Sequence, residues 1–317
     1  MSLVAKNVLT ALADLFLPRL CCVCGEELGR NERYICLNCL ADMPLTHNWL
    51  VRRNPMAERF NALVERHEIL EMEESLPDGA DELIFTGTED AEIMSPKAED
   101  AETISSGSDK LADGCFSKYV HAVALFDFLK NGEVENSGGY RNITYRLKYA
   151  RDIREGRFFA AMLGERAAAV EWLSDVDTVI PVPLHWTRRL RRGYNQAEVI
   201  ASEVAKSLGA SLRTDILERR RCTSTQTKLG IEEKARNVSG AFAVGKRFRR
   251  RFNKTETLDG ALSIDKISGE RNSLTIRHIL LVDDVFTTGS TLYNCWRPLH
   301  DFFGSSVRIS IATLGLV

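Results

Sequence analysis

The chain has 317 residues, of which 44% are apolar, and a net charge of −2. This length allows one large hydrophobic core together with a small appended module. No stretch reaches the roughly 18 to 20 uninterrupted apolar residues of a membrane span. The apolar run at residues 8–18 is short, contains Asp14 and has only Lys6 before it, so it does not indicate a signal peptide. We therefore expect a cytoplasmic protein whose eight cysteines stay reduced.

The first predicted element is a zinc-binding module at residues 1–50. Cys21 and Cys24 form one CxxC pair, Cys36 and Cys39 form a second, and eleven residues separate the two pairs. Two such pairs predict a structural zinc site, because four thiolates complete a tetrahedral ligand set and leave no open position for catalysis. A redox-active CxxC pair and unliganded buried thiols are the alternatives, and Cys22 is a second candidate for the position of Cys21.

Residues 51–118 are predicted to form a linker with an acidic insertion. Apolar residues recur at helical spacing in 52–70, whereas 71–114 is acidic and poor in aromatic residues, which predicts disorder. Residues 65–113 contain sixteen Asp and Glu against three Lys and Arg, a balance of −13 that leaves about +11 for the rest. That positive remainder favours phosphates or nucleic acid as ligands. Mimicry of nucleic acid toward a basic partner is the alternative role for the insertion.

Residues 119–317 show the alternation of strands and helices that predicts an α/β domain. Predicted strands at 120–128, 178–182, 211–217, 241–244, 277–282 and 307–314 alternate with predicted helices at 140–149, 157–173, 195–208, from 231 and from 290. Such an order builds a mostly parallel sheet flanked by helices, with ligands beyond the carboxyl ends of the strands. A polar insertion at about 246–275 interrupts the pattern, and its basic and aromatic start is either a solvated loop or a contact for single-stranded DNA.

The most informative loop follows the predicted strand at 279–282. It reads Asp-Asp-Val-Phe-Thr-Thr-Gly-Ser-Thr from Asp283 to Thr291. Two adjacent carboxylates accept hydrogen bonds from vicinal hydroxyls and hold a hard cation, directly or through water. The following turn offers hydroxyls and backbone N–H groups at a helix start, which suits a phosphate. Together they predict a ribose 5-phosphate site. Alone, the Asp-Asp pair would indicate an ordinary turn, and the Thr-Thr-Gly-Ser-Thr run would indicate a helix cap.

A second loop follows the predicted strand at 178–182. It carries four arginines within five positions, at 188–192, close to the edge of the sheet. Several forked donors in one loop suit a pyrophosphate, and a solvated basic face is the alternative.

The run ILLVDDVFTTGST resembles the 5-phosphoribosyl-1-pyrophosphate signature of type I phosphoribosyltransferases. The resemblance implies that Asp283 and Asp284 contact the ribose and organise Mg²⁺, and that Arg191 and Arg192 bind pyrophosphate. It also implies a 5-phosphate loop made of Thr287, Thr288, Gly289, Ser290 and Thr291. The runs PVPLH and RRGYNQA, Gln226, the run RNV at 236–238 and the four-cysteine module resemble the ComF family of competence-associated, phosphoribosyltransferase-like proteins.

Three functions are compatible with these motifs. The first is transfer of phosphoribosyl to an unknown acceptor, which residues 129–172 or the zinc module would bind. The second is a non-catalytic ligand sensor in DNA uptake, with single-stranded DNA or a helicase-like protein as partner. The third, a phosphoribosylpyrophosphate synthetase, also requires an ATP site, which we do not find in the sequence.

Overall fold

The computed structural model describes residues 18–75, 119–128, 139–150, 152–221, 240–256, 262–266 and 274–317, with only the backbone at 73–75 and 251–275. Most of the predicted acidic insertion, the predicted helix from residue 231, Gln226 and the run RNV at 236–238 lie outside these residues. So do residues 129–138, which belong to the region predicted to bind the acceptor.

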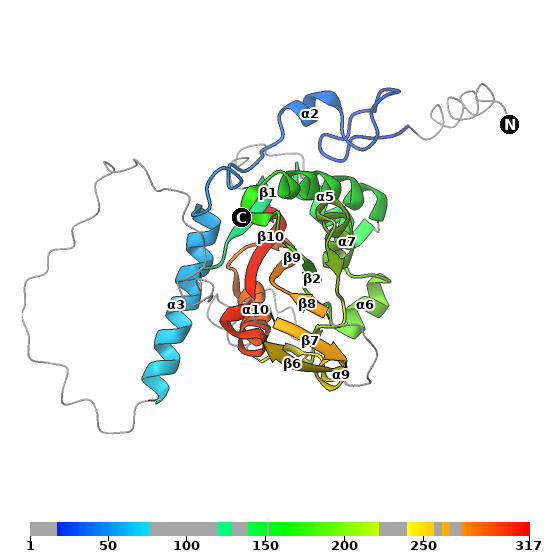
Figure 1. Ribbon diagram of the computed structural model, residues 1–317. Helices are drawn as coiled ribbons and strands as arrows, with labels where there is room; N and C mark the ends of the chain where they lie inside the picture. Colours follow the sequence, from blue (N-terminus) through cyan, green and yellow to red (C-terminus); the bar gives the residue numbers. More distant parts are fainter. Residues whose placement is uncertain are drawn as a thin grey trace, which may run out of the picture.

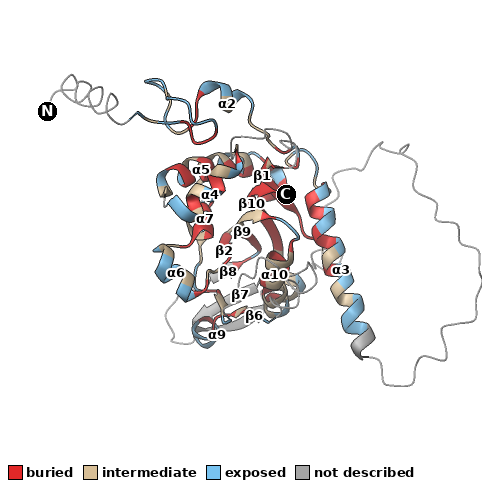
Figure 2. Cartoon of the chain, turned by 180° about the vertical axis from the view of Figure 1, so that it is seen from behind, coloured by how far each residue is buried: buried red, intermediate tan, exposed pale blue. Residues whose placement is uncertain are grey.

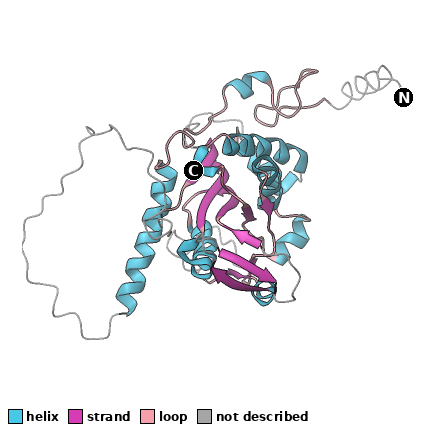
Figure 3. Ribbon diagram, in the orientation of Figure 1, coloured by secondary structure: helices cyan, strands magenta, loops and turns pink. Residues whose placement is uncertain are grey.

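A parallel sheet of five strands forms the centre of the protein (Figure 1). Its strand order is β1-β10-β9-β2-β3. The strands span Ala122–Asp127 (β1), Thr178–Pro181 (β2), Ser211–Leu212 (β3), His278–Phe286 (β9) and Arg308–Leu316 (β10). The predicted α/β class, with a parallel sheet flanked by helices, is confirmed (Figure 3).

Strand β9 lies in the middle of the sheet because its side chains are apolar on both faces. It pairs with β10 and with β2, so that Leu281 lies beside both Ile311 and Ile180. Ile279 and Leu281 belong to the core on one face, and Leu280 and Val282 to the core on the other. All four are fully buried, as expected for successive residues of a strand covered on both sides.

Helices cover both faces of the sheet. One face is covered by α3 (Pro55–Ser75), by α10 (Ser290–Phe303) and by the antiparallel pair of β4 (Leu217–Arg219) and β5 (Phe242–Val244). The other face is covered by α4 (Arg141–Tyr145), the π-helix η2 (Arg146–Ala150), α5 (Ile153–Ala168), the short helix η3 (Glu171–Leu173) and α7 (Gln196–Leu208). In Figure 2 the buried residues concentrate on the sheet and on the helix sides that face it.

Helix α3 confirms the helical spacing predicted for residues 52–70, and it continues to Ser75. Its residues Met56, Ala57 and Phe60 are fully buried, and the helix packs against β1 and α10. The segment predicted as a linker therefore contributes to the core of the α/β unit. Arg59 adds polar contacts, because its guanidinium donates to the carbonyls of Val317 and Thr287 at 3.1 and 2.8 Å.

Three segments differ from the prediction. The arginine loop is a short helix, α6 (Trp186–Arg192), which ends at Gly193 with a φ of +90° that favours glycine. The predicted strand at 211–217 divides into β3 and β4, which lie in different sheets. The region at 246–275 begins with α9 (Lys246–Arg251) and continues as a three-stranded antiparallel sheet of β6 (Phe252–Glu256), β7 (Leu262–Lys266) and β8 (Leu274–Ile276). The last turn before β10 is η4 (Gly304–Ser306).

The four-cysteine module packs beside the second face of the sheet. It contains the short helix α2 (Leu37–Ala41), and Cys21, Val23 and Ile35 join the core formed with α5. The Tyr140 hydroxyl donates to the Cys39 carbonyl at 2.6 Å. Within the described part of the chain, no helix has both the length and the apolar composition that crossing a bilayer requires.

Candidate functional site

A cavity of about 270 Å³ opens beyond the carboxyl ends of β2 and β9. This is the edge at which parallel α/β sheets bind ligands. The cavity is lined by polar side chains from six elements and by the segment after β2, which contributes Val182, Pro183 and Leu184. The polar side chains are Lys148, Tyr149, Arg188, Arg191, Arg192, Asn195, Gln196, Arg219, Asp283, Asp284 and Thr291.

The two predicted carboxylates, Asp283 and Asp284, both line this cavity. Side chains alternate along a strand, so Asp283 follows Leu281 toward α10 and β4, and Asp284 follows Val282 toward η2. The Asp283 carboxylate accepts a hydrogen bond from the backbone N–H of Asp284 at 2.9 Å. Burial, and then the charge of Asp284, raise the pKa of Asp283 to about 7. Two carboxylates this close attract a cation strongly.

A lysine on the π-helix η2 balances this negative charge. The Lys148 ammonium forms an ion pair with Asp284, with Nζ 2.7 Å from Oδ2. Arg146 of the same helix pairs with Glu155 at 2.8 Å and with Asp152 at 3.2 Å. The Tyr194 hydroxyl donates to the Leu147 carbonyl. These contacts hold η2 against α5 and against the segment before α7, and they place Lys148 at the cavity.

Helix α6 brings the predicted arginines to the cavity wall. Arg188, Arg191 and Arg192 line it, whereas Arg189 lies on another side of the helix and pairs with Glu198 at 3.4 Å. The Arg192 guanidinium carbon lies 5.3 Å from the centre of the Tyr149 ring. Three guanidinium groups from one helical turn and a half therefore surround a space that suits a polyanion.

The predicted phosphate turn lies between β9 and α10. Gly289 precedes the helix with a φ of +80°, and a side chain there would come within 3.1 Å of the Phe286 ring. The Thr288 and Ser290 hydroxyls are 2.9 Å apart. Of the five predicted residues of this turn only Thr291 lines the cavity, while Thr287 and Thr288 are exposed beside it. The structure thus brings Asp283, Asp284, Arg191, Arg192 and Thr291 together and places the rest of the turn at the rim.

Several cavity residues were not predicted by the sequence analysis, and three of them are Lys148, Arg219 and Gln196. Lys148 carries no recognisable signal, because it is one lysine in an amphipathic stretch. Arg219 reaches the cavity from β4, where its guanidinium lies 5.0 Å from the centre of the Phe242 ring. Gln196 had a signal, since it belongs to the run RRGYNQA. Its side chain is only 4% exposed, and its Nε2 has no hydrogen-bond partner among the residues that the structure describes.

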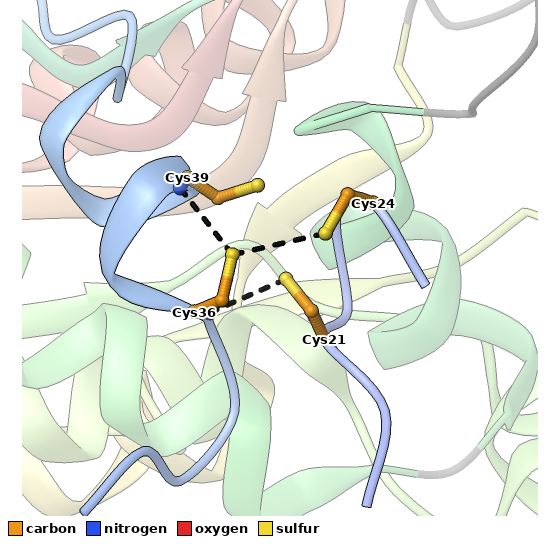
Figure 4. A group of neighbouring side chains, drawn as sticks. All are labelled: Cys21, Cys24, Cys36 and Cys39. Atoms are coloured by element: carbon orange, nitrogen blue, oxygen red, sulfur yellow. Dashed lines mark hydrogen bonds between the residues drawn. The ribbon is translucent and has the colours of Figure 1, made fainter. Parts of the chain in front are cut away.

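The second candidate site is the four-cysteine cluster (Figure 4). The sulfur atoms of Cys21, Cys24, Cys36 and Cys39 all lie within 4.8 Å of one another. Cys36 begins helix α2, and its sulfur accepts from the backbone N–H of Cys39 at 3.4 Å. Gly25 closes the first pair with a φ of +78° and donates from its N–H to the Cys21 carbonyl at 3.0 Å. The cluster can therefore bind one metal ion with four sulfur ligands.

The structure distinguishes Cys21 from Cys22. Burial raises the pKa of the Cys21 thiol, but hydrogen bonds from neighbouring backbone N–H groups outweigh it and lower the pKa to about 7. Cys22 lies outside the cluster. Burial and the nearby charge of Glu155 raise the pKa of its thiol. Cys21 is therefore the member of this pair that fits a metal ligand, because a ligand thiol must lose its proton.

The chain is similar to curated proteins of competence and DNA utilization, although no family model matches it. It is 33% identical to Competence protein F of Haemophilus influenzae over 133 residues, which are 42% of this chain and 48% of that protein. It is 29% identical to DNA utilization protein YhgH of Salmonella typhi and 28% identical to YhgH of Escherichia coli (strain K12), each over 116 residues. These matches cover 37% of this chain and 40% of the two YhgH proteins. The chain thus matches less than half the length of these relatives, and they support the predicted resemblance.

Proposed function

We propose that this ComF-like chain binds 5-phosphoribosyl-1-pyrophosphate and Mg²⁺ and transfers the phosphoribosyl group to an acceptor. The observation that carries the proposal is the composition of the cavity at the sheet edge. Two carboxylates lie opposite one lysine and four arginines, with a turn of small hydroxyl residues at the rim. A sugar with hydroxyls and two phosphorylated ends matches this distribution of charge.

Each group of side chains has a distinct role in this proposal. The carboxylates of Asp283 and Asp284 accept hydrogen bonds from the ribose hydroxyls. The turn at Thr287, Thr288, Gly289, Ser290 and Thr291 donates hydroxyl and backbone hydrogen bonds to the 5-phosphate. Arg191 and Arg192 bind the pyrophosphate, because forked donors match phosphate oxygens in pairs.

The donor set also fits Mg²⁺. Asp283 and Asp284 present carboxylate oxygens to the cavity, and oxygen is the ligand atom that this cation prefers. When bound, the cation would neutralise charge on the departing pyrophosphate. The proposed cofactors are thus Mg²⁺ at this edge and a structural Zn²⁺ at Cys21, Cys24, Cys36 and Cys39.

The proposed reaction is a displacement at the anomeric carbon of the ribose. The bond from this carbon to pyrophosphate breaks, and negative charge develops on the leaving oxygens. Arg191 and Arg192 stabilise that charge from a fixed helix, which lowers the barrier without a covalent intermediate. The cavity walls hold the sugar in place and exclude water, which would otherwise compete with the acceptor.

The names of the relatives support a role in competence or DNA uptake. A second candidate function is therefore a non-catalytic module that senses the ligand and binds single-stranded DNA or a helicase-like partner in the cytoplasm. One observation favours it: Lys246, Arg247, Arg249 and Arg250 on α9 are all exposed, while Phe248 anchors the helix against Phe302 and Phe303. Such a row of cations suits a phosphate backbone.

Calorimetric titration with 5-phosphoribosyl-1-pyrophosphate, called the sugar diphosphate below after the pyrophosphate on its anomeric carbon, tests the proposed site. The titration is carried out with and without Mg²⁺. We expect binding that requires Mg²⁺ and that falls at least tenfold in Asp283→Asn/Asp284→Asn. Asp301→Asn is the matched control, because this carboxylate is exposed and pairs with Arg297 outside the cavity. Absence of binding by the native chain would refute the proposal.

Pyrophosphate release separates the two candidate functions. Release in the presence of an acceptor panel, abolished by the double substitution, would establish the transferase. Tight binding without release, together with salt-dependent DNA binding lost in a variant with the four exposed α9 cations changed to Gln, would establish the module.

A further inference from the structure

Lys148 occupies the position where a divalent cation would meet Asp284. Its Nζ lies 2.7 Å from Asp284 Oδ2, a distance at which an ammonium makes a full charge-assisted hydrogen bond. Neither partner is loosely held at the surface, since the two side chains are only 28% and 13% exposed. Burial and the charge of Asp284 raise the pKa of Asp283, and the charge of Lys148 opposes this rise, so the lysine acts on both carboxylates.

The backbone that leads to Lys148 is held by contacts of the two preceding residues. Arg146, two residues before it, pairs with Glu155 and Asp152, and the Leu147 carbonyl accepts from Tyr194. The segment is a single π-helical turn, a conformation that is rare and concentrated at functional sites. The backbone therefore holds the lysine at the cavity, and only its flexible side chain remains to move between partners.

An ammonium and a divalent cation cannot both contact the same carboxylate oxygen. Two positive charges within about 4 Å repel one another strongly wherever water is partly excluded. A cation that binds Asp284 must therefore displace Nζ. Of the other charged groups in the described lining, Arg219 and the arginines of α6 are positive, and the carboxylate of Asp283 would face the same cation. A phosphate of the incoming ligand is therefore the partner that leaves both carboxylates to the cation.

We propose that Lys148 competes with a divalent cation for Asp284 and, once displaced, binds a phosphate group of the incoming ligand. Metal binding and ligand binding are thereby coupled: the cation alone must work against the ion pair, whereas cation and phosphates together give Lys148 a new partner. The competition depends only on the contacts of Lys148, whereas its transfer to phosphate also rests on the proposed function.

Binding of Mn²⁺ alone, followed by electron paramagnetic resonance as a stand-in for Mg²⁺, tests the competition. We expect Lys148→Met to bind Mn²⁺ about tenfold more tightly than the native chain, and Lys148→Arg to bind it no more tightly. The gain must disappear in Lys148→Met/Asp284→Asn, which isolates the Asp284 site from any other Mn²⁺ site. Lys206→Met is the matched control, because Lys206 pairs with Glu203 on α7, away from the cavity.

Calorimetry with the sugar diphosphate and Mg²⁺ tests the transfer. We expect Lys148→Met to weaken this binding about tenfold, opposite in direction to its effect on Mn²⁺. A structural role for Lys148 would weaken both, and that outcome would overturn the proposal, as would unchanged Mn²⁺ binding. If no variant binds the sugar diphosphate while Mn²⁺ affinity rises in Lys148→Met, the competition stands and the proposed function falls.

Discussion

The two ends of strand β9 carry buried ionisable side chains in very different surroundings. His278 begins the strand, and Asp283 and Asp284 lie near its end. Both ends also have arginine close by, Arg308 at the first and Arg219 at the second. Burial and charge alone therefore do not distinguish a functional end from a structural one.

The amino end is a closed network. His278 is fully buried; its Nδ1 donates to Asp175 at 2.8 Å, and its Nε2 accepts from the Ser310 hydroxyl at 2.8 Å, the arrangement that fits a neutral ring. Arg308 pairs with the same Asp175. Burial lowers the pKa of His278 to about 4.

The carboxyl end is open. Its carboxylates and arginines line a cavity, and the buried Nε2 of Gln196 has no hydrogen-bond partner among the described residues. The comparison shows that the functional end is marked by an open cavity lined by charged side chains, and not by burial, charge or unsatisfied polar atoms alone. Substitutions at a closed end should affect folding, and those at the open end should affect ligand binding.

The four-cysteine cluster extends the comparison, because its four sulfur atoms can fill all four coordination positions of a zinc ion and leave none for a ligand. We expect Cys21→Ser to reduce bound zinc from one per chain to none and to unfold the module, since structural zinc sites contribute about 10 kcal/mol or more to folding. Zinc content by mass spectrometry under native conditions measures the loss.

Cys22→Ser is the matched control for this prediction. It leaves the four clustered sulfur atoms in place, so zinc content should stay at one per chain. Zinc retained in Cys21→Ser and lost in Cys22→Ser would reverse our assignment of the ligand.

Removal of two arginines at the open end should change ligand affinity far more than stability. Arg191→Gln/Arg192→Gln should bind the sugar diphosphate about 100-fold more weakly, because each charge-assisted hydrogen bond is worth about 1.5 to 3 kcal/mol. Arg189→Gln is the control, as this arginine is on the same helix but pairs with Glu198. Equal losses in both variants would mean that the charge of α6 acts as a whole, without specific contacts.

The closed amino end should reveal itself in the pH dependence of stability. The unfolded chain binds a proton at His278 near pH 6.5, whereas the folded chain resists it until about pH 4, so acidification through this window favours unfolding. Between pH 7 and 4.5 the free energy of unfolding should fall by about 2 to 3 kcal/mol more in the native chain than in His278→Gln.

Urea unfolding at the two pH values measures this difference, and titrating groups that do not contact His278 cancel between the two chains. Asp175 is the exception, because burial raises its pKa but the contact with His278 helps to lower it overall. His47→Gln, at an exposed position, should behave as the native chain. The native chain, His278→Gln and His47→Gln should have equal ligand affinity at pH 7. A loss of affinity in His278→Gln would contradict our assignment of a structural amino end and a ligand-binding carboxyl end to β9.

Much of this arrangement follows from local sequence. Four apolar residues before Asp283 predict a central strand, and the spacing of the cysteines predicts their cluster. The lining of the cavity was only partly predictable, because it depends on distant contacts. Lys148 reaches Asp284 through a π-helical turn that Arg146 and Tyr194 hold in place, and no local pattern encodes such a turn. The three strands at 252–276 were missed because each is only three to five residues long. The alternation in Leu262–Lys266 and in Leu274–Ile276 is therefore too short to indicate a strand.

Gln196 and its neighbour Asn195 give the most detailed test of the difference between paired and ligand-binding side chains. Both are buried, but only the Asn195 side-chain nitrogen has a hydrogen-bond partner among the described residues. The Asn195 side-chain amide donates to the Val182 carbonyl at 2.9 Å, whereas Nε2 of Gln196 donates no hydrogen bond to any described residue. Gln196→Met should weaken binding of the sugar diphosphate about fivefold, the value of one neutral hydrogen bond of about 1 kcal/mol. It should leave the free energy of unfolding unchanged or raise it, since an unsatisfied buried donor is removed.

Asn195→Leu should do the opposite and lower the free energy of unfolding, because it leaves the Val182 carbonyl without its donor. Urea unfolding of both variants measures the change in the free energy of unfolding, and calorimetry measures the change in ligand affinity. If Gln196→Met lowers stability as Asn195→Leu does, its amide is satisfied within the chain, and Gln196 belongs with the closed networks and not with the ligand site.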